Sequence, residues 1–177
     1  MIRLTVRFDM KGASQYVSAV LLIVTVTLAG SAEAEILTGR VVAVADGDTL
    51  TVLDQQRITH KIRLIGIDAP EKAQPFGAVS KQHLAELLFQ RDVQVQWEKK
   101  DRYGRTLGKV LLNGTDVNLR QITDGMAWWY RHYARDQEPT DQARYSEAEA
   151  RAQRGRIGLW SVDSPTSPWD WRHAKNH

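Results

Sequence analysis

Two short stretches carry carboxylates directly beside a predicted strand. Asp46 and Asp48 flank a glycine before a β-branched run. Asp68 and Glu71 follow the apolar stretch RLIGI. If the two strands pair as antiparallel neighbours, Asp48 at the start of one and Asp68 at the end of the other lie at the same end of the sheet. Carboxylates that converge in this way require a cation, because their mutual repulsion otherwise raises a pKa or opens the site.

The available ligand types point to a hard cation. The chain has no cysteine, and its histidines are scattered, at His60, His83, His132, His173 and His177. Oxygen ligands without thiolates or clustered imidazoles favour Ca²⁺ or Mg²⁺ over zinc or copper. Ca²⁺ accepts about six to eight oxygens in irregular geometry, so two carboxylates, a backbone carbonyl and water would be sufficient. Taken alone, each acidic stretch also fits an ordinary hairpin turn or an exposed strand exit.

Two arginines are candidates for binding a phosphate. Arg63 would lie about 16 Å from Asp68 along a straight strand, with the opposite side-chain orientation. Gly66 is where the chain could bend, since a glycine inside a strand often marks a bulge. A predicted hairpin (DRYGR) places Arg105 beside Tyr103, where a guanidinium group could hold a phosphate while a base or sugar packs on the tyrosine. The alternatives are an outward-facing strand arginine and a solvated turn.

Short strands and three helices are predicted to position these groups. Alternating β-branched and polar residues predict strands at 38–45, 49–53, 57–67, 93–97 and 106–112. Helical periodicity predicts helices at 78–90, 117–124 and 140–153. Five short strands with a helix after the third and further helices after the fifth favour an α+β fold, a five-stranded β-barrel of the OB type with about three helices. Such barrels commonly bind nucleic acid or sugar on one face.

The N-terminal residues have the pattern of a secretory signal peptide. Three basic residues precede an apolar run at about 17–29, and a small-x-small cleavage pattern follows at 32–34. This run is shorter than the roughly 20 residues of a membrane-spanning helix. We therefore predict a signal peptide at 1–34, cleavage near Ala34, export to the periplasm or the medium, and one domain at 35–177 without a stable membrane span. An uncleaved N-terminal anchor is the alternative.

Charge and composition restrict the partners only weakly. The chain has 24 Lys and Arg against 21 Asp and Glu, a net charge of +3. Residues 1–34 contain three basic and two acidic residues, so their removal lowers the net charge to +2. Such a mild excess permits a polyanionic partner without requiring one. Because the chain lacks cysteine, an exported domain must be stabilised by its core or by a bound metal.

The ordered set of motifs is more specific than any single one. DGDT at 46–49, RLIGIDAPE at 63–71 and DRYGR at 101–105 together closely resemble the staphylococcal-nuclease-like, or thermonuclease, family. The resemblance continues through YSEAEARAQRGRIGLW at 145–160 and PWDWR at 168–172. It implies a five-stranded OB barrel that hydrolyses DNA and RNA with Ca²⁺ and little sequence specificity, as an endo- or exonuclease that leaves 3′-phosphate products.

The resemblance also implies roles for individual residues. The implied Ca²⁺ ligands are the carboxylates of Asp48 and Asp68 and the backbone carbonyl of Ala69. The implied catalytic residues, two guanidinium groups on the phosphate and one carboxylate that activates or orients water, are Arg63, Arg105 and Glu71. The implied further substrate contacts are Arg102, Tyr103 and Tyr133.

The sequence departs from the family pattern at a few of these positions. Ala69 stands where familiar members have threonine, but a backbone carbonyl does not depend on the side chain. Arg102 replaces a common lysine and keeps its charge. The segment WWYRHY at 128–133 is unusually aromatic, and we expect Trp128, Trp129 and Trp160 in the core, as is usual for large aromatic residues.

Two other functions are compatible with the same fold. One is a non-catalytic OB module that binds nucleic acid, and the loss of either arginine or of Glu71 would have favoured it. The other is a membrane-tethered protein with a structural or interaction role. The family includes plasmid-encoded members, so plasmid maintenance or transfer is one biological setting, and we expect the protein to be a monomer.

Overall fold

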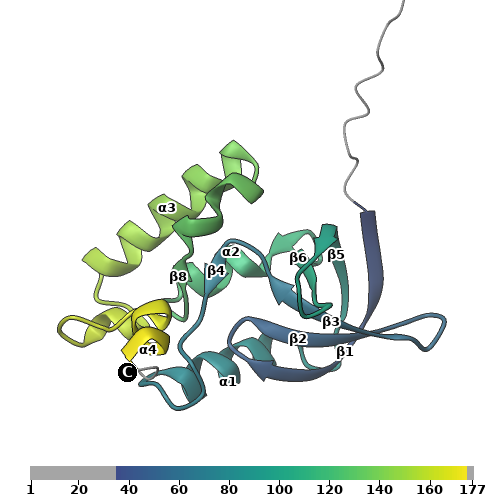
Figure 1. Ribbon diagram of the computed structural model, residues 1–177, viewed down its shortest axis with the longest axis horizontal. Coiled ribbons are helices and arrows are strands. Elements are labelled where there is room, and N and C mark those ends of the chain that lie inside the picture. Colours follow the sequence, from purple (N-terminus) through teal and green to yellow (C-terminus); the bar gives the residue numbers. More distant parts are fainter. Residues whose placement is uncertain (1–34, 175–177) are drawn as a thin grey trace, which may run out of the picture. The chain divides into compact units, whose positions relative to one another are not determined.

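The computed structural model describes residues 35–174, so the predicted signal peptide at 1–34 lies outside the described residues. Five strands form a barrel: β1 (Glu35–Asp46), β2 (Thr49–Asp54), β3 (Thr59–Leu64), β5 (Asp92–Lys100) and β6 (Thr106–Leu112). Strands β1, β2 and β3 form an antiparallel meander, and β5 pairs with both β1 and β6 (Figure 1). Parallel pairing of β3 with β6 closes the barrel. The predicted five-stranded barrel with helices is confirmed.

The barrel is filled by apolar side chains that alternate along each strand, as the period of two predicts. The fully buried ones from the barrel strands are Val41, Leu50, Val52, Ile62, Leu64, Val95 and Val110. Leu84 and Leu88 from one face of the first helix join the same core. Each such side chain stabilises the fold by roughly 1.5–3 kcal/mol relative to an exposed one. The core therefore gives the barrel a rigid frame.

The three predicted helices are present, and each end lies within two residues of its predicted position. They are α1 (Gly77–Leu88), α2 (Val117–Thr123) and α3 (Pro139–Arg154). Helix α1 packs on β1, while α2 contacts both β6 and α3. Helix α2 follows the short strand β7 (Thr115–Asp116), and the Asp116 carboxylate caps it by accepting a hydrogen bond from the Leu119 N–H at 3.0 Å.

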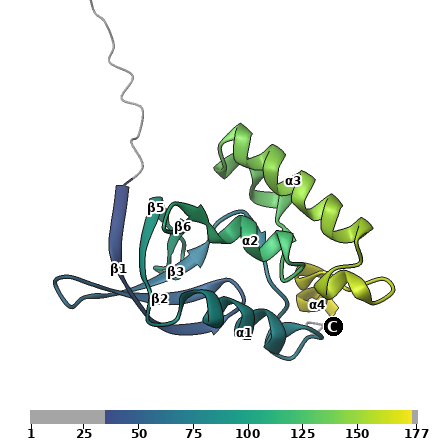
Figure 2. The ribbon, with the colours of Figure 1, turned by 180° about the vertical axis from the view of Figure 1, so that it is seen from behind.

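A fourth helix, α4 (Pro168–Ala174), was not predicted. Seven residues are too few to show a helical period, and a helix of that length is not stable alone. The 3₁₀ segments η1 (Arg131–Asp136) and η2 (Gly158–Ser161) also lie between the longer elements. Helices α3 and α4 lie on the same side of the barrel in Figures 1 and 2. None of the helices in residues 35–174 is both long and apolar enough to span a membrane.

The strand predicted at 57–67 is wrong at both ends. At its start, Ile58 lies in the loop between β2 and β3 and is 56% exposed. At its end, the chain turns at Gly66, whose φ of 77° is a left-handed conformation that glycine adopts without steric cost. The next two residues form β4 (Ile67–Asp68), which pairs with β8 (Trp128–Trp129) instead of continuing the barrel strand.

Candidate active site

The residues singled out in the sequence line one cleft of about 760 Å³. The predicted site residues along its wall are Asp48, Arg63, Asp68, Ala69, Glu71, Arg102, Tyr103, Arg105 and Tyr133. The fold thus brings together all of the candidate residues, from segments as distant in sequence as the β1–β2 turn and η1. Their individual roles remain predictions.

The turn between β1 and β2 holds Asp48 against the barrel. Its carboxylate Oδ2 accepts a hydrogen bond from the Ala69 N–H at 2.6 Å, and its carbonyl accepts one from the Leu64 N–H at 2.8 Å. At the centre of the turn, the buried Gln121 side chain of α2 donates from Nε2 to the Gly47 carbonyl at 2.7 Å. Asp48 is therefore positioned by three different parts of the chain.

Gly47 is required by close packing in this turn. A Cβ atom there would lie 1.9 Å from Ser80 Oγ and 2.7 Å from Ala69 Cβ. We expect Gly47→Ala to lower the free energy of unfolding by about 1–3 kcal/mol, as overpacking does, and to weaken the predicted Ca²⁺ binding by displacing Asp48. Urea unfolding and calorimetric Ca²⁺ titration measure the two effects. Gly155→Ala, in a roomier place at the end of α3, is the control and should change the Ca²⁺ affinity little.

The turn at Gly66 brings Asp68 back alongside Arg63. Arg63 Nη2 lies 2.9 Å from Asp68 Oδ1, and Arg63 Nη1 lies 3.0 Å from Asp48 Oδ2. The same Nη1 also donates to the carbonyls of Leu64 and Ile67 at 3.1 and 3.0 Å. The predicted bend is confirmed, and Arg63 lies between the two buried carboxylates. Its terminal nitrogens are thus already engaged with protein, while within residues 35–174 its Nε makes no hydrogen bond.

The aromatic segment at 128–133 fixes this turn. Asp68 pairs with Trp128 in the β4–β8 ladder, and the Tyr130 N–H donates to the Gly66 carbonyl at 2.9 Å. Trp128 is buried and packs edge-on against Trp160, with 5.3 Å between the ring centres. The core position predicted for Trp128 is confirmed. The segment therefore serves to hold Asp68 in the cleft.

Burial perturbs the Asp48 carboxyl group. Only 6% of this residue is exposed. Loss of solvation raises its pKa to about 7, although Arg63 opposes the shift, and repulsion from Asp46 and Asp68 adds to it. A neighbouring cation would favour the ionised form again. A cation bound beside Asp48 would therefore lower the pKa of this carboxyl group.

The donor set fits Ca²⁺ with help from water. Within residues 35–174, no three acidic or histidine side chains gather closely enough to hold a metal on their own. A carboxylate has about four acceptor positions. On Asp48, two are used by hydrogen bonds from Thr49 and Ala69, and the ion-pair contact with Arg63 lies beside them. On Asp68, three are used by hydrogen bonds from Arg63 and Arg172. At least one position on each carboxylate remains, which suits an ion that completes its shell with carbonyl and water oxygens.

Asp101, the first residue of the DRYGR hairpin, stabilises the hairpin through its side chain. Asp101 Oδ1 accepts hydrogen bonds from the N–H groups of Tyr103 and Arg105, both at 2.9 Å, and Oδ2 pairs with Arg105 Nε at 2.7 Å. Among residues 35–174, Arg105 makes no hydrogen bond through its terminal Nη atoms, which stay available for an anion. The Arg102 guanidinium lies 4.8 Å from the centre of the Tyr103 ring, and Tyr103 is 68% exposed. The hairpin thus presents a fixed cation beside an exposed aromatic ring.

Sequence reasoning missed an arginine of the cleft that pairs with two of its carboxylates. Arg172 of α4 pairs with Asp68, Nη2 to Oδ2 at 2.8 Å, and with Glu71, Nη1 to Oε1 at 2.7 Å. The PWDWR segment was recognised as part of the resemblance, but nothing in its local pattern places it near residues about 100 positions earlier. Only the packing of α4 does so.

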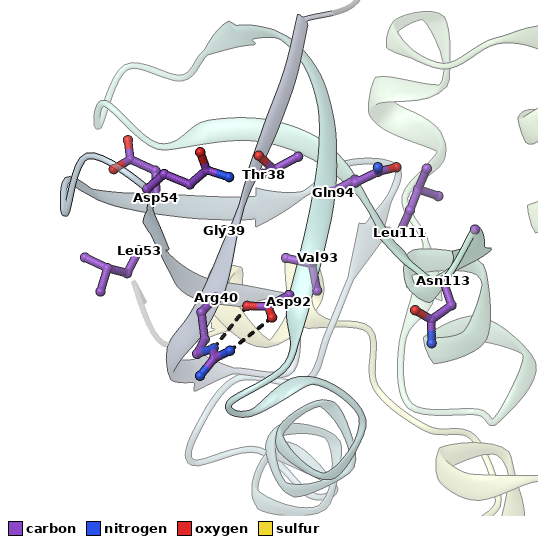
Figure 3. A pocket seen from close by; sticks show the side chains of 12 residues that line it. Thr38, Gly39, Arg40, Leu53, Asp54, Asp92, Val93, Gln94, Leu111 and Asn113 are labelled. Carbon is purple, nitrogen blue, oxygen red and sulfur yellow. Dashed lines mark hydrogen bonds and ion pairs between the residues drawn. The ribbon is translucent and has the colours of Figure 1, made fainter.

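A second hollow, of about 730 Å³, lies beside β1, β2 and β5 (Figure 3). Its charged pair is Arg40 with Asp92, joined by Nε–Oδ1 and Nη2–Oδ2 contacts of 3.0 Å each. Both side chains are exposed and satisfy one another. This hollow contains none of the motif residues, so the cleft around Asp68 is the better candidate for chemistry.

Comparison with known proteins supports the resemblance to the staphylococcal-nuclease-like family. Residues 61–162, more than half of the chain, match the family model described as staphylococcal nuclease homologue. The chain is 44% identical over 148 residues to a protein named micrococcal nuclease from Shigella flexneri, covering 78% of this chain and 82% of that protein. It is 42% identical over 158 residues to an uncharacterized endonuclease of Haemophilus influenzae, covering 89% and 84%. It is also 42% identical over 151 residues to Protein ParB of Escherichia coli, covering 80% and 82%. A chain with this barrel, this cleft and these relatives belongs to the family of staphylococcal nuclease homologues.

Proposed function

We propose that this protein is a Ca²⁺-dependent nuclease that hydrolyses phosphodiester bonds of DNA and RNA with little sequence specificity. The observation that carries the proposal is the pairing of Arg63 with two buried carboxylates, Asp48 and Asp68, in a cleft that also contains Glu71 and Arg105. Family membership supports nuclease activity, and the names of two relatives include nuclease or endonuclease.

The chemistry requires positive charge around a pentacoordinate phosphorus. Attack of water on a phosphodiester gathers negative charge on the non-bridging oxygens, and donors placed there stabilise the transition state more than the ground state. Arg105 offers its free Nη atoms, and Arg63 its remaining N–H groups, to those oxygens. Asp48, Asp68 and the Ala69 carbonyl would hold Ca²⁺, which supplies further positive charge when bound.

Glu71 is the proposed base. Its side chain is 42% exposed, so water reaches it, and Arg172 contacts it through Oε1, which leaves Oε2 to accept a proton from the attacking water. The 5′-oxygen then leaves and takes up a proton from solvent water, which gives a 3′-phosphate on one product and a 5′-hydroxyl on the other. Arg102, Tyr103 and Tyr133 are proposed to contact the substrate, since Tyr103 and Tyr133 expose ring surface beside the cleft.

The biological setting is proposed from the sequence. We propose that residues 1–34 direct export and are removed, and that the mature protein acts as a monomer in the periplasm or the medium. A role in plasmid maintenance or transfer is part of the same proposal.

Hydrolysis of single-stranded DNA and RNA by the purified protein, in Ca²⁺ and then in excess EGTA, tests the proposed activity. Cleavage that stops with EGTA and returns with Ca²⁺ supports it. Binding without cleavage over a range of divalent metals would instead favour a non-catalytic module that binds nucleic acid.

Asp48→Ala tests the metal site. Removal of this carboxylate should raise the Ca²⁺ concentration for half-maximal activity by at least about tenfold, since even indirect partners of a metal contribute that much. Calorimetric Ca²⁺ titration measures the binding without substrate. Asp92→Ala removes an exposed carboxylate in the other hollow and should leave the titration unchanged. An unaltered titration of Asp48→Ala would remove this residue from the metal site.

A further inference from the structure

The Arg172 side chain of α4 lines the cleft and contacts Glu71, the proposed base. The guanidinium group bridges two acidic residues, with contacts of 2.7 Å to Glu71 Oε1 and 2.8 Å to Asp68 Oδ2. Asp68 is buried and held by the β4–β8 ladder, whereas the Glu71 side chain is partly exposed. Arg172 therefore connects the partly exposed carboxylate of Glu71 to the buried one of Asp68.

Glu71 is held by the same C-terminal segment from its backbone side. The Glu71 N–H donates to Gln74 Oε1 at 3.0 Å, and Gln74 Nε2 donates to the carbonyl of Thr166 at 2.7 Å. Gln74 is buried, so this link is shielded from water. The segment from Thr166 to Arg172 thus contacts the main chain of Glu71 through Gln74 and its side chain through Arg172.

Helix α4 is itself anchored next to the cleft. The Ser167 hydroxyl accepts a hydrogen bond from the Asp170 N–H at 3.3 Å at the start of the helix. The Trp169 ring stacks on Tyr130, with 5.5 Å between centres and 18° between planes. Tyr130 lines the cleft and follows β8. These contacts hold the backbone of α4 at Arg172 in place. A helix of only seven residues needs such contacts, because it is not stable alone.

We propose that Arg172 is a positioning residue, which holds the Glu71 carboxylate in the orientation that accepts the proton of water. The inference rests on the proposed nuclease function. Within residues 35–174, Arg172 is the side chain that contacts the Glu71 carboxylate, and a free glutamate side chain has considerable rotamer freedom. Misplacement of a catalytic group by about 1 Å can cost about 10²-fold in rate. Because only Oε1 is engaged, the contact orients the carboxylate without blocking it.

Steady-state cleavage of a labelled oligonucleotide at saturating Ca²⁺ tests the proposal. Arg172→Ala should lower kcat by about 10- to 100-fold while KM changes by less than about threefold, since misplaced chemistry rather than lost binding is expected. Arg172→Lys should recover part of the loss, because it keeps the charge without the bidentate geometry. Arg151→Ala removes an exposed arginine of α3 that pairs with Glu147 and should not alter kcat.

A double-mutant cycle separates positioning of Glu71 from a general structural role. In a Glu71→Gln background, Arg172→Ala should lower kcat by less than about threefold, because the group that it positions is already inactive. Thermal unfolding and oligonucleotide anisotropy in Ca²⁺ report folding and binding. If Arg172→Ala does not fold, Arg172→Lys carries the same cycle.

The outcomes distinguish this inference from the nuclease proposal. An unchanged or higher kcat for Arg172→Ala would overturn the positioning role, the higher value because it would mean that Arg172 restrains Glu71. A full additional loss in the Glu71→Gln background would overturn it as well. Failure of the wild-type protein to cleave with Ca²⁺ would instead overturn the nuclease proposal on which the inference rests.

Discussion

Glu71→Gln should lower kcat by about 10²- to 10⁴-fold, the usual range for loss of a general base. The substitution keeps the size of the side chain and an oxygen that can accept the hydrogen bond of Arg172. Folding and oligonucleotide binding should therefore stay near the wild-type values. Single-turnover cleavage at saturating Ca²⁺ measures the chemical step, and fluorescence anisotropy measures binding.

The matched control is Glu147→Gln, which changes an exposed glutamate of α3 in an ion pair with Arg151. This control should cleave at the wild-type rate. If Glu71→Gln also kept a near-normal rate, water activation would have to be assigned to another group. A parallel loss of binding would show that Glu71 acts on the substrate complex rather than on the attacking water.

Arg63→Lys should lower kcat/KM by more than about tenfold, because a lysine cannot reproduce a planar group that bridges two carboxylates. Arg63 contacts Asp48 with one terminal nitrogen and Asp68 with the other. A single ammonium group can neutralise one of these neighbours well but cannot span both. The two buried carboxylates would then lose part of their compensation, so the free energy of unfolding should fall as well.

Arg40→Lys provides the comparison for this substitution. Arg40 also makes a two-point contact with a carboxylate, Asp92, but both groups are exposed to solvent and such pairs contribute little to stability. The kinetics and the unfolding curve of Arg40→Lys should therefore match those of the wild type. An effect of Arg63→Lys as small as that of Arg40→Lys would remove Arg63 from the phosphate site.

The barrel was predictable because its signals are local. Alternation of apolar residues identified the strands around Val52 and Val95, and a period of 3.6 identified the helix that buries Leu84 and Leu88. The carboxylates Asp48 and Asp68 could be placed together because antiparallel neighbours bring such ends to one side. The turn at Gly66 was predicted from a glycine inside an apolar run, and the structure confirms it.

The features that sequence reasoning missed depend on contacts between distant segments. The pairing of β4 with β8 has two residues on each side, which is too short for any periodic pattern. Arg172 lies on a helix of seven residues, and its partner Glu71 is about 100 residues away. The incorrect assignment of Ile58 to a strand has a different origin, since this loop residue continues the apolar alternation of β3 by chance.

The pairing of β3 with β6 is a place where the barrel can open locally. It is a parallel ladder of three residue pairs, with Arg63 opposite Leu107, and Arg105 directly precedes β6. Parallel pairing is slightly weaker per residue than antiparallel pairing, and short ladders are natural places for local opening. Opening of this seam would separate Arg63 from Arg105 while the meander of β1, β2 and β3 stayed intact. We therefore expect local, reversible opening of this ladder to disrupt the proposed phosphate site at a lower free energy than global unfolding.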